Sequence, residues 1–146
     1  MVRAFLFSAV LCACTSDNQE AAPKTPIRSA AELSAYLRTA RDSPLDQLQP
    51  AARQRFLDSL VFGEHELGGF RYTELQVLSP DDVYQILSLF GAERTVPMVL
   101  RGHIQSEADK LAPIARRPKG EDHENYYCQS PHNCVTTSGV ICMTGC

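Results

Sequence analysis

The 146-residue chain lacks several features that would place it in a familiar class. It has no tryptophan, and no cysteine lies between Cys14 and Cys128. No apolar run reaches the roughly 20 residues that a helix needs to cross a membrane, so we expect no spanning segment. The net charge of −3 is small, and no basic stripe interleaved with aromatic residues occurs. Both features argue against a nucleic-acid partner.

Patterns typical of catalysis are also missing. His65-Glu66 begins like the His-Glu-x-x-His motif of zinc proteases, but position 69 is glycine. No Gly-x-Ser-x-Gly elbow, Walker loop or dinucleotide fingerprint occurs. The adjacent acids Asp81-Asp82 stand at a predicted helix start, where the helix dipole favours them without any catalytic role. We therefore predict that the protein is not an enzyme and has no cofactor.

The first fourteen residues have the build of an export signal. Arg3 supplies a positive charge, and an apolar segment with a single serine follows over residues 4–11. The segment ends Leu11-Cys12-Ala13-Cys14. This run resembles the lipobox of bacterial prolipoproteins, in which an aliphatic residue, a small residue and Ala or Gly precede the cysteine.

That resemblance implies that residues 1–13 are a signal peptide and that Cys14 carries fatty acyl chains such as palmitate. Two or more chains give stable membrane anchoring, whereas one gives only marginal binding. Thr15 follows the lipid site in place of aspartate, which resembles the sorting pattern for the outer membrane. We expect a lipid-anchored protein of the cell envelope; the alternative is a plain secretory signal and a secreted product.

Residues 14–28 are rich in Ser, Asn, Gln, Ala and Pro, which predicts a flexible tether. Residues 29–115 carry repeated helix signals and predict a helical domain. Ser29 and Glu32 have the spacing of a capping box, which predicts a helix over about residues 30–39.

Two further helices are predicted to begin at prolines. Pro50 suits the first position of a helix that extends to about Phe62. Ser79 and Pro80 begin the clearest helix, which Gly91 ends. Its apolar residues recur at helical spacing and predict the centre of the core.

The remaining stretches are less regular. Residues 70–77 are predicted to be extended or irregular, because a lone strand would lack a partner there. Residues 95–100 are predicted to be extended around Pro97, and residues 107–115 to form a short helix. The sequence thus predicts a mainly α fold, a small helical domain with a short, disulfide-linked, β-hairpin-like tail over residues 116–146.

Four cysteines crowd the tail, and an even number in an exported chain indicates disulfides. Thr137-Ser138-Gly139 suits a three-residue hairpin loop, which would place Cys134 opposite Cys142. Of the three possible pairings, we predict Cys134–Cys142 and Cys128–Cys146.

Metal binding is the rival interpretation of the same residues. His123, Cys128, His132 and Cys134 offer nitrogen and sulfur ligands for a tetrahedral zinc ion, with Cys142 and Cys146 nearby. The tail contains no Cys-x2-Cys pair, however, and an oxidising compartment favours disulfides over thiolates.

These observations predict an envelope lipoprotein with a binding or structural role, whose partner is an unknown envelope protein or peptide. The alternative is an exported precursor whose tail, released after Arg116-Arg117, is the active peptide; its Cys, Ser and Thr residues faintly resemble bacteriocin-type precursors. Residues 121–146 contain no Lys or Arg, whereas membrane-disrupting peptides are usually cationic. A weaker alternative is a tail that binds metal or senses redox state.

Overall fold

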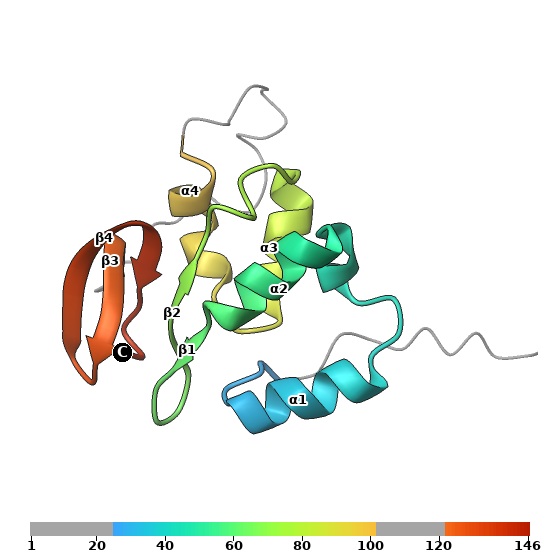
Figure 1. The fold of residues 1–146 in the computed structure, drawn as a ribbon, viewed down its shortest axis with the longest axis horizontal. Coiled ribbons are helices and arrows are strands. Elements are labelled where there is room, and N and C mark those ends of the chain that lie inside the picture. The colour runs from blue at the N-terminus through green and yellow to red at the C-terminus, as the bar shows by residue number, and fades with distance from the viewer. Residues whose placement is uncertain (1–24, 102–121) are drawn as a thin grey trace, which may run out of the picture.

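The computed structural model describes residues 25–101 and 122–146, in which short helices pack against one antiparallel sheet (Figure 1). The helices are α1 (Ala30–Thr39), α2 (Pro50–Asp58), α3 (Pro80–Ser88) and α4 (Val96–Val99), with 3-10 turns η1 (Pro44–Gln47) and η2 (Glu93–Thr95). The strands are β1 (Val61–Phe62), β2 (Leu67–Arg71), β3 (His123–Ser130) and β4 (Asn133–Cys142).

The predicted mainly α fold class is wrong, because the four strands form a sheet in the order β1-β2-β4-β3. The sheet joins the middle of the chain to its C-terminal part: Phe70 in β2 lies opposite Ile141 in β4. The fold class was predicted wrongly because β4, the partner of β2, lies far away in the sequence. No local pattern indicates that these two segments pair. Residues 70–77 were predicted to have no strand partner for the same reason.

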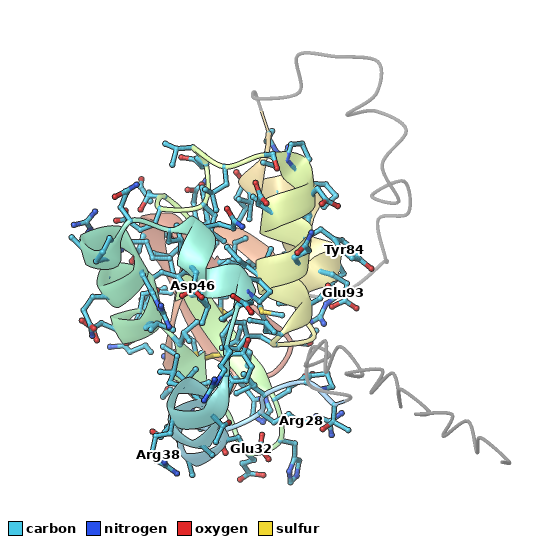
Figure 2. The ribbon with its side chains drawn as sticks, turned by 90° about the vertical axis from the view of Figure 1, so that its right-hand side faces the viewer. Arg28, Glu32, Arg38, Asp46, Tyr84 and Glu93 are labelled. Atoms are coloured by element: carbon cyan, nitrogen blue, oxygen red, sulfur yellow. A yellow bond between two sulfur atoms is a disulfide. The ribbon has the colours of Figure 1, made fainter. Side chains whose placement is uncertain are left out.

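The helix starts follow local chemistry, as predicted. The Ser29 hydroxyl accepts a hydrogen bond from the Glu32 N–H (3.2 Å) and caps α1, whose bounds are the predicted ones. The Glu32 carboxylate accepts from the Arg28 N–H (2.6 Å), and Figure 2 labels both residues. Ser79 caps α3 in the same way, accepting from the Asp82 N–H (3.2 Å).

Helix α2 ends at Asp58 and not at the predicted Phe62. Ser59 explains the difference: its hydroxyl donates to the Phe56 carbonyl (2.6 Å) and accepts from the Arg71 N–H of β2 (2.9 Å). The chain then enters β1 and pairs with β2. A tertiary contact to the sheet therefore ends this helix.

The predicted extended segment over residues 95–100 is also wrong, because η2 and α4 occupy it. Pro97 lies in the first turn of α4, where its missing N–H has no helical partner to lose. The short helix predicted over residues 107–115 lies outside the described residues.

The main core lies between the helices and one face of the sheet. Phe56 of α2 stands edge-on to Phe70 of β2 and to Phe90, with ring centroids 6.1 Å apart in both pairs. Ile141 and Met143 from the C-terminal segment are buried in the same cluster. The predicted helical domain and tail thus share one core.

The N-terminal end of the described chain also joins this core. Ile27, which the sequence analysis places in the flexible tether, is 3% exposed. Its N–H donates a hydrogen bond to the Leu89 carbonyl (2.7 Å) at the end of α3. The packed part of the chain therefore includes a residue before the predicted start of the domain.

Glycines permit the β1–β2 hairpin and the C-terminal segment to approach closely. A Cβ atom on Gly63 would overlap the carbonyl oxygen of Gly145, and one on Gly145 would overlap Glu66 and the backbone of Leu67. The Met143 N–H donates to the Gly68 carbonyl across this junction (2.8 Å). At Gly63 the contact is with the backbone of Gly145, so rotating a side chain could not relieve it.

Replacing Gly63 with alanine should lower the free energy of unfolding by about 1–3 kcal/mol, because the added methyl overpacks this junction. Urea unfolding of the oxidised protein, followed by circular dichroism, measures the change. Ser138→Ala, on an exposed side chain, is the control and should leave the midpoint unchanged. An unaltered midpoint for Gly63→Ala would contradict the close contact.

Candidate functional site

The C-terminal strands form a curled arm, which we define as β3 and β4 together (Figure 1). Cys128 lies opposite Cys134, but further along the ladder Glu124 lies opposite Ile141. β4 therefore carries an insertion around residues 137–140 that β3 does not match. This large bulge, in which residues 137–140 face Asn125 alone, bends the arm sharply.

Two residues in left-handed backbone conformations support the bulge, Asn125 (φ 66°) and Gly139 (φ 76°). The Asn125 Oδ1 accepts hydrogen bonds from the Gly139 N–H (3.0 Å) and from the Tyr72 hydroxyl (3.1 Å). Burial and, after it, the Glu124 carboxylate raise the pKa of Tyr72, so the phenol keeps its proton. Through Asn125, these two hydrogen bonds connect the bulge to Tyr72, just after β2.

The bulge brings two cysteines of one strand together. Cys134 and Cys142 are 8 residues apart in β4, which a straight strand would separate by about 26 Å. Their Cα atoms lie 6.0 Å apart and their sulfurs are bonded. A second disulfide joins Cys128 to Cys146, with Cα atoms 5.6 Å apart.

These are the same two pairs that the sequence predicted, but the predicted hairpin geometry is wrong. Thr137-Ser138-Gly139 belong to the bulge, whereas the turn of the hairpin lies at Pro131-His132 between β3 and β4. His132 adopts φ 61° there, and its N–H donates to the Cys146 carbonyl (2.8 Å). The hairpin loop was misplaced because β3 was not recognised as a strand.

The two disulfides lie against each other. The Sγ atoms of Cys128, Cys142 and Cys146 all lie within 4.8 Å of one another, and these residues are 6%, 0% and 6% exposed. Cys134 is partly exposed, and Val61 of β1 packs against the group. We call the four cysteines, Cys128, Cys134, Cys142 and Cys146, the cysteine cluster. The cluster forms a second, smaller core beside the main one.

The alternative metal ligands, His123, Cys128, His132 and Cys134, are not brought together as a set. Among the described residues, Cys128, Cys142 and Cys146 form the one close group of potential ligands, and it contains neither His123 nor His132. The His123 ring lies 5.5 Å from the Tyr126 ring, and His132 is an exposed turn residue. A sulfur in a disulfide offers no thiolate to a metal ion.

An ion pair that was not predicted from the sequence holds the arm against η2. Arg94 of η2 donates to both carboxylate oxygens of Asp122 (2.7 and 3.2 Å) and to the Thr144 hydroxyl (3.0 Å). The Thr144 N–H also donates to Asp122 (3.0 Å). Hydrogen bonding to Asp122, whose side chain is 5% exposed, raises the pKa of Arg94 and keeps the guanidinium charged. No spacing rule links two residues so far apart in the sequence.

Asp122→Asn should reduce the free energy of unfolding by about 1–3 kcal/mol, because it leaves the half-buried Arg94 charge without its anion. Thermal unfolding at neutral pH measures the loss. Glu74→Gln is the control: it removes the Arg55–Glu74 pair, also bidentate (2.7 and 2.9 Å), in which the arginine side chain is 57% exposed against 27% for Arg94, and should cost less. Equal losses would show that the Arg94–Asp122 pair has no special role.

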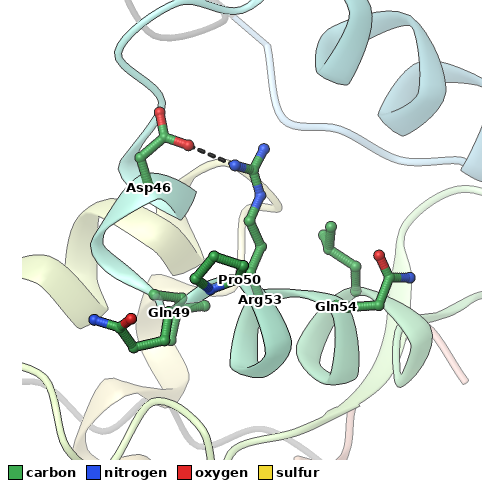
Figure 3. Close-up of a pocket in the computed structure, with 7 residues that line it drawn as sticks. Asp46, Gln49, Pro50, Arg53 and Gln54 are labelled. Atoms are coloured by element: carbon green, nitrogen blue, oxygen red, sulfur yellow. Dashed lines mark hydrogen bonds and ion pairs between the residues drawn. The ribbon is translucent and has the colours of Figure 1, made fainter.

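A shallow cavity of about 300 Å³ lies over η1 and the start of α2 (Figure 3). The Arg53 guanidinium in it already pairs with the Asp46 carboxylate (2.5 Å). The remaining lining consists of Leu48, Gln49, Pro50, Gln54 and Leu57. The two charges neutralise each other, so the cavity presents no unpaired charge to a ligand.

Two neighbouring tyrosines of the arm are exposed to solvent. Tyr126 and Tyr127 are 38% and 41% exposed on β3, an edge strand of the sheet. Adjacent residues of a strand point to opposite faces, so both faces of the arm are open to solvent here. Tyr84, labelled in Figure 2, is similarly exposed (36%) but lies on α3.

The predicted lipid site, Cys14, lies outside the described residues. Within them, the helices are too short and too polar for any to traverse a bilayer.

The structure thus defines an α+β protein with two adjacent disulfides at the end of its sheet. No family model, curated protein or solved structure matches the chain.

Proposed function

We propose that the chain is an extracytoplasmic bacterial lipoprotein, anchored through Cys14, whose arm binds a protein or peptide of the envelope. One observation carries the proposal: two adjacent disulfides, in which Cys134 alone is partly exposed, hold the bent arm in place. Loss of a native disulfide from a small exported domain typically costs about 2–5 kcal/mol. Such a fold suits an oxidising compartment, because the cytosol keeps thiols reduced.

The anchor rests on the N-terminal sequence. Leu11-Cys12-Ala13-Cys14 resembles a lipobox, and Thr15 resembles the residue that follows the lipid site in outer-membrane lipoproteins. Acylation at Cys14 would hold the folded part at the membrane surface without any spanning helix. The disulfides and the lipobox-like run are independent features, and both favour an exported protein.

The binding role rests on the arm. Tyr126 and Tyr127 present large amphipathic side chains of the type that is enriched at protein interfaces. They lie on an edge strand, whose free backbone groups can pair with an extended segment of a partner. A protein or peptide partner fits both properties.

The alternative function, in which the tail is released as a peptide, gains no support from the described residues. Ile141 and Met143 are buried in the main core, and β4 pairs with β2. Release would expose these side chains and break the centre of the sheet.

Intact mass spectrometry of the membrane-extracted protein tests the anchor. We expect a mature chain that begins at Cys14 and carries acyl chains, and Cys14→Ser should abolish both acylation and membrane retention. Cys12→Ser is the matched control: it replaces a cysteine of the leader with a residue common in lipoboxes and should leave acylation intact. A soluble, unacylated product from the unaltered chain would refute the proposal.

The double variant Tyr126→Ala, Tyr127→Ala should weaken capture of an envelope partner at least about tenfold, because buried tyrosines are frequent hot spots. Quantitative pull-down from envelope extracts, with circular dichroism to verify folding, measures this loss. Tyr84→Ala removes an equally exposed tyrosine from α3 and should retain the partner. Equal capture by the double variant and the unaltered protein would remove the arm as the binding surface.

A further inference from the structure

The cysteine cluster places one sulfur against the other disulfide. Cys142 is bonded to Cys134, yet its Sγ lies within 4.8 Å of the Sγ atoms of both Cys128 and Cys146. The Sγ of Cys134 is not part of that close group. Cys142 is therefore the end of its own disulfide that lies next to the Cys128–Cys146 bond.

The four cysteines also differ in exposure. Cys142 is fully buried (0% exposed), Cys128 and Cys146 are nearly buried (6% each), and Cys134 alone is partly exposed. A thiolate from solvent therefore meets the cluster first at Cys134. Access is one of the factors that decide which sulfur of a disulfide is attacked.

We propose that the cysteine cluster is a coupled thiol–disulfide exchange site for small-molecule thiols, a property that goes beyond the binding role. In the first step, the incoming thiolate attacks the Cys134 sulfur. A mixed disulfide forms at Cys134, the Cys134–Cys142 bond breaks, and the electron pair leaves on Cys142 as a thiolate. One S–S bond is broken and one is made.

In the second step, the Cys142 thiolate attacks the neighbouring Cys128–Cys146 bond. A new bond joins Cys142 to either cysteine, and the other leaves as a thiolate that takes a proton from solvent. The physical drive is desolvation: the charge moves from a fully buried residue to one at the margin of solvent. Each step exchanges one S–S bond for another, and the incoming thiol is the only co-reactant.

Trapping in the unaltered protein tests this sequence. The oxidised protein is treated briefly with reduced glutathione, quenched with acid, and alkylated with N-ethylmaleimide after unfolding; tandem mass spectrometry then locates both groups. In the single-glutathione product, we expect glutathione on Cys134. If the three pairings of Cys128, Cys142 and Cys146 are equally stable, roughly two-thirds of the alkyl label should lie on Cys128 and Cys146.

Label confined to Cys142 would show that the second step does not occur and would overturn the proposal. Glutathione on Cys128 or Cys146 as the first adduct would overturn the assigned point of entry. Because this experiment uses the unaltered chain, it does not depend on whether any variant folds, and it is independent of the anchor at Cys14.

A pair of variants isolates the second step. Cys134→Ser leaves a permanent Cys142 thiol beside the Cys128–Cys146 bond, and label should appear on Cys128 and Cys146 without any added thiol. Cys142→Ser is the matched control, since it also leaves one thiol, at Cys134, outside the close sulfur group. Its label should remain on Cys134. Label only on Cys142 in Cys134→Ser would overturn the internal exchange.

Discussion

The pairing of β2 with β4 is the contact on which the rest of the structure depends. One face of this strand pair packs in the main apolar core, and the other contributes to the cysteine cluster. Phe70 and Ile141 lie opposite each other, both fully buried, and belong to the main core with the helices. The next pair along joins Gly69 to Cys142 of the cysteine cluster, and Gly69 leaves room there for the Ile141 carbonyl and for Cys128. One strand pair therefore organises both the apolar core and the disulfides.

The arm itself is too small and too exposed to hold its shape by burial. Of the side chains of β3, Cys128 alone is buried. Covalent bonds replace packing in such units, and here the two disulfides lie side by side at the sheet. The Arg94–Asp122 pair and its bonds to Thr144 hold the start of β3 and the C-terminal turn against η2. The stability of the arm and its proposed exported destination are thus aspects of the same chemistry.

Sequence reasoning succeeded where the cause of a structure is local. The serine and proline that begin α3, and the capping residues of α1, satisfy N–H groups within one turn, so their spacing is visible in the chain. The disulfide pairs were also predicted, although from a hairpin loop at residues 137–139 that the structure places in a bulge. Sequence reasoning failed where a feature depends on residues far apart in the chain. These features are the fold class, the end of α2, which a contact with β2 sets, and the Arg94–Asp122 pair. Cys14 remains a prediction.

The sequence by itself determined the number of cysteines available for bonding. It also determined the helix starts and the resemblance of residues 11–14 to a lipobox, since both depend on neighbours within a few positions. Only the tertiary structure decided that β2 has a partner, that the Cys142 sulfur lies within 4.8 Å of both sulfurs of the other disulfide, and that Tyr126 and Tyr127 are exposed. The reason is physical: strand pairing, burial and the distance between sulfurs depend on segments that meet only when the chain has folded.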